Sequence, residues 1–195
     1  KLSIVILAAG KGTRMRSAIP KVLQPLAAKP LLSHVLDTVS ELGAHETCIV
    51  YGHGGELVHS EFCSMPLNWA LQEPQLGTGD AVKQAMPMVS PDSTVVVLYG
   101  DVPLVLPETI RRMTDATEGN KLALMTVDAV NPHGYGRIVR NAAGAVQAIV
   151  EEKDASDQQR KINEVNTGLM ACPARLIGPW LQALKADNAQ SEFYL

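Results

Sequence analysis

The sequence predicts an α/β fold, a doubly wound and mostly parallel sheet that carries an antiparallel hairpin in its second half. Over about the first 130 residues, short apolar runs alternate with amphipathic segments, which is the pattern of parallel strands joined by helices. After these residues the pattern changes to two runs of alternating apolar and polar residues on either side of a glycine turn, which indicates a hairpin. The 195 residues, 46% of them hydrophobic, are enough to bury the core of a globular domain without support from disulfide bonds or metal sites.

The first half of the chain contains the alternating elements. Residues 2–9 are apolar and rich in Ile and Val, as in a strand that is buried on both faces. Pro30 stands at a favoured first position of a helix, whose apolar residues recur at helical spacing until Gly43 ends it. Further strands are expected at residues 46–51, 67–71, 94–99 and 122–127, and further helices at residues 55–62, 77–86 and 107–116.

The second half is less regular. Residues 136–154 are predicted to form the hairpin, with an Ala-Ala-Gly turn between its two runs. Residues 166–173 are expected to add one more strand, and residues 174–186 a final amphipathic helix. The apolar side chains expected to pack that helix are Leu176, Trp180, Leu181 and Leu184. Because no repeat or linker interrupts the chain, we expect a single domain over residues 1–195.

Composition argues against several classes of protein. Seventeen Lys and Arg against twenty Asp and Glu leave a formal net charge of −3, whereas nucleic-acid binding calls for a clustered basic excess. Cys48, Cys63 and Cys172 show no CxxC spacing, so neither a zinc site nor a disulfide framework is indicated. No signal peptide is visible, and no apolar run reaches the roughly 18 residues of a membrane span. We therefore expect a cytoplasmic protein with free thiols and without nucleic-acid or membrane partners.

A glycine-rich turn, GKGTRM at residues 10–15, follows the first expected strand. A dinucleotide-binding turn of the pattern GxGxxG would need Gly or Ala where Met15 stands. A P-loop would need Lys and then Ser or Thr directly after its second glycine, and here the lysine precedes that glycine. A third design remains, in which backbone N–H groups of a glycine turn bind phosphates directly.

Charged residues near this turn fit the third design. Arg14 and Lys21 would supply the full positive charges that amide groups lack, whereas Arg16 is interpreted as a solvated loop charge. Asp101 ends the most apolar strand, and such a residue lies at the carboxyl edge of the sheet, where doubly wound folds bind ligands. Mg²⁺ is typically held by one or two carboxylates together with substrate phosphates and water, so Asp101 is the candidate magnesium ligand.

The turn, with Pro20-Lys21 after it, resembles the signature of nucleotidyltransferases that make nucleotide sugars. Further matching stretches are LQEPQLGTGDA (71–81), YGDVPL (99–104), GYGRI (134–138) and EVNTG (164–168). In this order and spacing they resemble the uridyltransferase domain of the bifunctional N-acetylglucosamine-1-phosphate uridyltransferase and glucosamine-1-phosphate acetyltransferase family, essentially from end to end of the chain. The resemblance implies a Rossmann-like fold of the nucleotide-diphospho-sugar transferase type.

The resemblance also implies a Mg²⁺-dependent reaction. In it, UTP and N-acetylglucosamine 1-phosphate would give UDP-N-acetylglucosamine and pyrophosphate, which supplies cell-wall precursor synthesis. The catalytic residues implied are Arg14, Lys21 and Asp101, with Asp101 as the metal ligand. The positions that match the nucleotide site are Leu7, Ala8, Ala9, Gly10, Lys21, Gln72, Gly77 and Thr78. The positions that match the sugar-phosphate site are Tyr99, Gly100, Asp101, Gly136, Glu151 and Asn166.

The same resemblance divides the chain and marks where it departs from the family. Residues 1–105 are expected to form the nucleotide-binding half and residues 106–195 the sugar-phosphate-binding half. Asp80 and Glu152 stand where histidine is common in the family. The family's uridyltransferase domain continues past the last residue here, with a second magnesium ligand, an asparagine, in the continuation and a trimer-forming acetyltransferase domain after it. We therefore expect an incomplete domain that binds UTP, turns over poorly and is monomeric, whereas the full-length family protein is a homotrimer.

Three other functions stay open at this stage. The fold and turn are compatible with another uridylyl-, thymidylyl- or cytidylyltransferase, and with a non-catalytic module that binds nucleotide sugars. A dinucleotide oxidoreductase is disfavoured by Met15. Histidine need not act in the transferase reaction, because a sugar 1-phosphate is already an anionic nucleophile, so His34, His53 and His133 are interpreted as structural.

Overall fold

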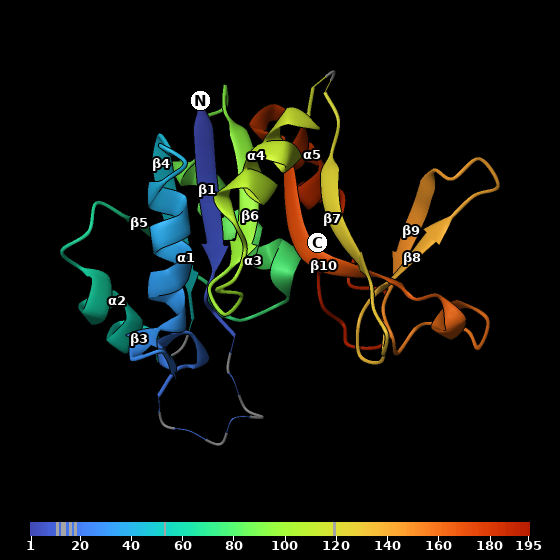
Figure 1. Ribbon diagram of the computed structural model, residues 1–195, viewed down its shortest axis with the longest axis horizontal. Coiled ribbons are helices and arrows are strands. Elements are labelled where there is room, and N and C mark those ends of the chain that lie inside the picture. Colours follow the sequence, from blue (N-terminus) through green and yellow to red (C-terminus); the bar gives the residue numbers. More distant parts are fainter. Residues whose placement is uncertain (11, 13–14, 16, 18, 53, 119) are drawn as a thin grey trace.

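The computed structural model describes residues 1–10, 12, 15, 17, 19–52, 54–118 and 120–195. An eight-stranded sheet runs through the protein, with strands in the order β5-β4-β1-β6-β10-β8-β9 and with β7 paired to β10. Helices cover both faces of this sheet (Figure 1). The doubly wound α/β fold that the sequence predicts is confirmed.

Four strands form the parallel half of the sheet. β1 (Leu2–Leu7), β4 (Glu46–Tyr51) and β6 (Thr94–Tyr99) are buried along most of their length, and β5 (Asn68–Leu71) forms the edge. β1 pairs in parallel with both β4 and β6, and β4 pairs with β5. The chain thus proceeds from β1 to β4 and β5 on one side, and then returns to the other side of β1. Such a reversal opens a crevice at the carboxyl ends of the strands, where ligands bind in doubly wound folds.

The last strand, β10 (Glu164–Pro173), lies between β6 and β7 (Ala123–Asp128) and is antiparallel to both. β7 therefore points in the same direction as the four parallel strands, and the sheet is mostly parallel. β8 (Arg137–Arg140) and β9 (Val146–Val150) form the predicted antiparallel hairpin, and β8 joins β10.

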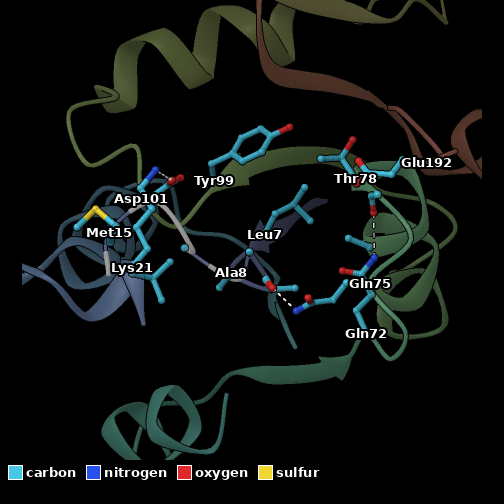
Figure 2. A pocket seen from close by; sticks show the side chains of 16 residues that line it. Leu7, Ala8, Met15, Lys21, Gln72, Gln75, Thr78, Tyr99, Asp101 and Glu192 are labelled. Carbon is cyan, nitrogen blue, oxygen red and sulfur yellow. Dashed lines mark hydrogen bonds and ion pairs between the residues drawn. The ribbon is translucent and has the colours of Figure 1, made fainter. Parts of the chain in front are cut away.

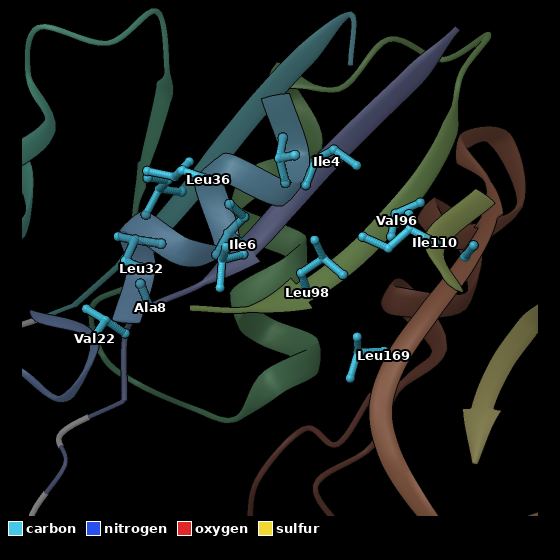
Figure 3. Packing of buried hydrophobic residues seen from close by; sticks show 14 of the residues in the cluster. Ile4, Ile6, Ala8, Val22, Leu32, Leu36, Val96, Leu98, Ile110 and Leu169 are labelled. Atoms are coloured by element: carbon cyan, nitrogen blue, oxygen red, sulfur yellow. The ribbon is translucent and has the colours of Figure 1, made fainter. Parts of the chain in front are cut away.

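Two apolar clusters lie on the two faces of the sheet, because successive residues of a strand point to opposite faces. On one face, residues of β1 such as Ile4 and Ile6 pack against α1 (Leu31–Ser40), α2 (Glu56–Phe62) and α4 (Pro107–Asp115) (Figure 3). On the other face, Val5 and Leu7 pack against α3 (Thr78–Ala85) and α5 (Ala174–Ala183). Each fully buried aliphatic side chain stabilises the fold by about 1.5–3 kcal/mol. Packing on both faces holds the carboxyl ends of β1 and β6 in place.

The observed elements follow the predicted ones, with differences at their ends. β1 ends at Leu7 rather than residue 9, because the chain turns out of the sheet through two buried alanines toward the glycine turn. α5 ends at Ala183, and its buried residues are Ala174, Ile177 and Leu181. Trp180 is 44% exposed, so its expected packing role was wrong. The buried residues follow the spacing i, i+3, i+7, and this places Trp180 beside the packed face rather than on it.

Several short elements have no signal in the sequence pattern. β2 (Pro25–Leu26) and β3 (Lys29–Pro30) form a small hairpin, and single 3₁₀ turns occur at η2 (Lys21–Leu23), η3 (Met86–Met88) and η4 (Gln159–Lys161). Elements of two or three residues are too short for hydrophobic periodicity to reveal. The three cysteines are free thiols, as predicted. In the described part of the chain, no helix has the length and apolar character that crossing a membrane requires.

Candidate nucleotide-binding site

A pocket of about 560 Å³ lies at the carboxyl ends of β1 and β6, where the order of the strands reverses (Figure 2). Its lining residues come from the glycine turn, the turn after β6, the start of α3 and the C-terminal segment. They are Leu7, Ala8, Ala9, Gly10, Gly12, Met15, Lys21, Val22, Gln72, Gln75, Gly77, Thr78, Ala81, Tyr99, Asp101 and Glu192. Every residue predicted from the resemblance to contact the nucleotide is in this set.

The glycine turn and Lys21 form one end of the pocket. Gly12 has a φ of +57°, a conformation that side chains rarely adopt, and a Cβ there would lie 3.3 Å from the Cβ of Lys21. The backbone of Gly12 therefore packs directly against η2, which carries Lys21 at its first position. Predicted residue Arg14, like Lys11, Thr13 and Arg16, lies outside the described residues.

Asp101 faces Lys21 across this end of the pocket. Gly100 donates its backbone N–H to the carbonyl of Leu7 at 3.0 Å, so the turn after β6 is fastened to the end of β1. The carboxylate of Asp101 then lies 2.5 Å from the Nζ atom of Lys21, and their side chains are 23% and 45% exposed. The structure thus places a cation, a carboxylate and a glycine turn at one sheet edge, as the sequence analysis requires.

The opposite wall is built by the segment that leads from β5 into α3. The side chain of Gln72 is buried, and its Nε2 donates to the carbonyl of Gly77 at 2.9 Å and to Oδ2 of Asp80 at 2.8 Å. Gln75, which the sequence analysis missed, donates from its Nε2 to the carbonyl of Ala9. This contact joins the α3 side of the pocket to the end of β1 across 66 positions of sequence. No local sequence pattern predicts this contact.

The C-terminal segment, residues 192–195, holds this wall in place through hydrogen bonds. Phe193 accepts from the backbone N–H of Gly79 and donates to the carbonyl of Leu76, both at 2.8 Å. The N–H of Leu195 donates to Oγ1 of Thr78 at 3.1 Å, and Glu192 lines the pocket. The segment was not among the predicted site residues, because its role depends on contacts with a loop more than a hundred positions earlier in the chain.

Four residues predicted for the sugar phosphate do not line the pocket: Gly100, Gly136, Glu151 and Asn166. The last three nevertheless form a connected group. A Cβ on Gly136 would lie 2.7 Å from Oε1 of Glu151, and the carbonyl of Gly136 accepts from the N–H of Asn166 at 2.8 Å. The side-chain oxygen of Asn166 accepts from the N–H of Gly168, also at 2.8 Å. Gly168 packs on the ring of Tyr99, which does line the pocket.

The family model for the MobA-like NTP transferase domain matches residues 4–166, most of the chain. This match includes the glycine turn, Lys21, Asp101 and the group around Gly136. The chain belongs to the MobA-like NTP transferase domain family.

The NTP transferase is 56% identical over 194 residues to the bifunctional protein GlmU of Azoarcus sp. (strain BH72), and 52% identical over 194 residues to that of Aromatoleum aromaticum. Each alignment covers 100% of this chain but 43% of the relative, so the chain spans less than half the length of these proteins. The resemblance to a bifunctional family that the motifs indicated is confirmed.

Solved structures share the fold of this NTP transferase at low identity. UDP-glucose pyrophosphorylase complexed with UDP-glucose aligns with a TM-score of 0.78 at 17% identity, over 98% of this chain and 83% of that chain. HddC from Yersinia pseudotuberculosis complexed with GMP-PN aligns with a TM-score of 0.70 at 21% identity, over 98% and 82% of the two chains. These likenesses establish the nucleotidyltransferase-type fold.

Electrostatics distinguish the two sides of the NTP transferase site. Burial, followed by the nearby carboxylates of Asp101 and Glu151, raises the pKa of Tyr99 to about 12, so its phenol stays protonated at neutral pH. Burial, with help from the charge of Asp154, also raises the pKa of Glu151, while Arg137 opposes this shift. The side away from Lys21 therefore offers a neutral hydroxyl and a partly desolvated carboxyl, groups that suit hydroxyl-rich ligands.

Glu152 pairs with a buried arginine. The guanidinium of Arg137 is buried, and its Nη2 lies 2.6 Å from Oε2 of Glu152. The same carboxylate oxygen accepts from the backbone N–H of Gly134 at 3.2 Å. These two hydrogen bonds, that to Arg137 first, lower the pKa of Glu152. Glu152 therefore compensates the buried positive charge of Arg137.

Removing the C-terminal brace is expected to weaken nucleotide binding. A chain that ends at Ser191 loses the hydrogen bonds of Phe193 and Leu195 to the Leu76–Gly79 loop. Each such bond contributes about 0.5–1.5 kcal/mol, so we expect UTP affinity to fall about tenfold or more, measured by calorimetric titration.

The matched control for this truncation is Glu192→Ala. It removes a pocket-lining side chain and leaves the backbone bonds of Phe193 in place. If Glu192→Ala lowers UTP affinity as much as the truncation does, the segment acts through that side chain and the bracing role is wrong. Circular dichroism spectra of both variants check that the domain stays folded.

Proposed function

We propose that this NTP transferase binds UTP in the pocket and transfers its uridylyl group to N-acetylglucosamine 1-phosphate. The products are UDP-N-acetylglucosamine, a cell-wall precursor, and pyrophosphate. The observation that carries the proposal is the 2.5 Å approach of Lys21 to Asp101 beside Gly10 and Gly12 at the switch point of the sheet. A bound triphosphate needs backbone N–H groups and cations, and its metal needs a carboxylate. The position of Lys21, Asp101 and the two glycines in one pocket lining supports the proposal.

The pocket offers separate surroundings for the two substrates. The base and ribose of UTP would lie between Leu7–Gly10 and the wall made by Gln72, Gly77 and Thr78, whose backbone and amide groups can pair with a ring edge. The sugar of the second substrate would lie toward Tyr99, where Gly100, Gly136, Glu151 and Asn166 follow. Carboxylate, amide and phenol groups there can bind sugar hydroxyl and acetamido groups.

The reaction requires positioning and charge neutralisation. An oxygen of the sugar phosphate attacks the α-phosphorus of UTP in line, and the bond from that phosphorus to the departing pyrophosphate breaks. The nucleophile is already an anion, so no side chain has to remove a proton. Lys21, together with Arg14, would neutralise the charge that develops on the transferred group and on the pyrophosphate.

The residues at this edge fit a magnesium ion that is shared with the substrate. Asp101 supplies one carboxylate at the pocket end that Lys21 and the glycine turn form. Within the described residues, no three His, Cys, Asp or Glu side chains gather into a metal cage of their own. Mg²⁺ is commonly held by one or two carboxylates plus substrate phosphates, which matches a single aspartate beside a triphosphate pocket. When bound, the ion would neutralise phosphate charge and orient the phosphates.

The direct test measures which substrates release pyrophosphate. The purified chain is incubated with Mg²⁺ and each pairing of UTP, dTTP, CTP and GTP with the 1-phosphates of N-acetylglucosamine, glucosamine, glucose and galactose. We expect release with UTP and N-acetylglucosamine 1-phosphate above all other pairs. Preference for another pair would assign a different nucleotidyltransferase. UTP binding without release at any Mg²⁺ concentration would favour the non-catalytic nucleotide-sugar module.

The assembly and location follow the same proposal. We propose a cytoplasmic enzyme whose 195-residue chain is monomeric, whereas the full-length proteins of the family are homotrimers. Sedimentation of the two forms distinguishes these states.

A further inference from the structure

Asp80 lies behind the wall of the pocket and contacts the predicted base-binding residue Gln72. Asp80 stands in the first turn of α3, and its Oδ2 lies 2.8 Å from Nε2 of Gln72. The same Nε2 lies 2.9 Å from the carbonyl oxygen of Gly77. Gln72 itself is 3% exposed, at the end of β5, so its amide group has little water to satisfy it.

These two contacts determine which way the Gln72 amide faces. A primary amide has two N–H donors and one carbonyl acceptor. Here both donors are directed at acceptors, one a carboxylate and the other a backbone carbonyl. Turning the amide over would set its Oε1 against two acceptor oxygens, which leaves buried polar groups unpaired at a high free-energy cost. The carboxylate of Asp80 therefore locks the amide in one orientation.

In this fixed orientation, the carbonyl oxygen of the Gln72 amide, Oε1, can accept a hydrogen bond from a ligand. Among the described residues, no donor is directed at Oε1 of Gln72, although the residue lines the pocket. An acceptor at this place needs a donor on the bound base. The uracil ring of UTP carries one donor, the N3–H group, between two carbonyl oxygens, whereas cytosine has an unprotonated acceptor at N3 and carries its donor on the 4-amino group, where uracil has a carbonyl oxygen. The amide orientation is thus matched to the imide edge of uracil.

We infer that Asp80 is a positioning residue for base selection: it holds Gln72 so that the glutamine accepts from the N3–H of uracil and disfavours cytosine. The inference rests on the proposed function, since it concerns the base of the same nucleotide. It assigns Asp80 no contact with the substrate. Its effect passes entirely through the amide of Gln72.

The test compares UTP and CTP binding in variants of position 80. Asp80→Asn keeps the shape of the side chain but can offer its own N–H₂ to Gln72, so the glutamine amide can turn over. Asp80→Ala removes the acceptor altogether. We expect both variants to lower UTP affinity about tenfold and to leave CTP affinity unchanged or higher, as measured by calorimetric titration. In steady-state assays, KM for UTP should rise while kcat changes little.

Gln84→Ala is the matched control. Gln84 donates to the other carboxylate oxygen of Asp80 at 3.2 Å from the exposed side of α3, so its removal leaves the contact to Gln72 intact. This variant should keep the UTP preference of the unchanged chain. Asp80→Glu tests whether a longer carboxylate restores part of the preference that Asp80→Asn loses.

Three outcomes separate the inference from its premise. If the unchanged chain shows no preference for UTP over CTP, the proposed function itself fails. Thermal denaturation checks that Asp80→Asn and Asp80→Ala are folded. If the unchanged chain prefers UTP and both folded variants keep that preference, Asp80 does not position the amide. Equal weakening of UTP and CTP would likewise overturn the inference, because a merely structural role affects both nucleotides alike.

Discussion

Replacing Asp101 by asparagine is expected to lower turnover by about a hundredfold while leaving the fold intact, because the variant keeps the shape of the side chain and loses its charge. Asn can still accept from Lys21 through its side-chain carbonyl, so the end of the pocket should keep its structure. A neutral amide brings no negative charge to the ion, so it binds Mg²⁺ more weakly than the carboxylate that it replaces. Pyrophosphate release from UTP and N-acetylglucosamine 1-phosphate measures the effect, and UTP titrations with Mg²⁺ or EDTA should show that magnesium no longer raises affinity.

Asp92→Asn provides the control for this prediction. Asp92 is exposed in the turn that precedes β6, at the opposite end of the strand that Asp101 follows. Asp92 carries the same charge as Asp101 and flanks the same strand. Asp92→Asn therefore tests whether the loss of one negative charge near β6 is enough to lower turnover. A folded Asp101→Asn protein that turns over at the rate of the unchanged chain would exclude Asp101 from the reaction.

The Gly168→Ala substitution is expected to destabilise the protein by about 3 kcal/mol and to impair sugar-phosphate use. Gly168 has a φ of +80°, and a Cβ there would lie 2.6 Å from both Cε2 and the hydroxyl oxygen of Tyr99. The strained backbone contributes about 1 kcal/mol, and the remainder comes from displacing a partly buried ring. Because Tyr99 lines the pocket, its displacement should also raise KM for N-acetylglucosamine 1-phosphate. Urea unfolding and steady-state kinetics measure the two effects.

Gly43→Ala separates strain from contact. Gly43 has a φ of +62°, and no atom lies within 4 Å of the position its Cβ would take. This variant should lose only the backbone contribution, about 1 kcal/mol, and should keep its kinetics. Equal destabilisation by the two substitutions would show that Gly168 does not support the Tyr99 ring.

The sequence predicted the parallel half of the fold well, because its signals are local. The Val- and Ile-rich runs at residues 46–51 and 94–99 are buried on both faces and were placed at their observed bounds. The pocket end made by the glycine turn and Lys21 follows from the order of chain segments around β1. Asp101 joins it because β6 and β1 are paired and parallel, so that both end at one edge.

Other features depend on contacts between distant segments, and no local pattern could show them. Gln75 reaches Ala9 across the pocket, and Phe193 pairs with the loop before α3. The residues proposed for the sugar phosphate come from a hairpin and from β10, which meet only in the folded chain. For these, only the resemblance to a family offers a prediction, because periodicity does not reveal them. The exposure of Trp180 was missed because a helix with two adjacent apolar stripes does not indicate which stripe faces the sheet.

The central position of β10 has a consequence for how the protein is made on the ribosome. The strand that pairs with β6 is the last in the chain, so the valine-rich edge of β6 stays unpaired until some seventy later residues have left the exit tunnel. During that interval the nascent chain presents an open, apolar strand edge, the kind of surface that chaperones cover and that promotes aggregation. Slow synthesis through residues 100–173 would prolong this exposure.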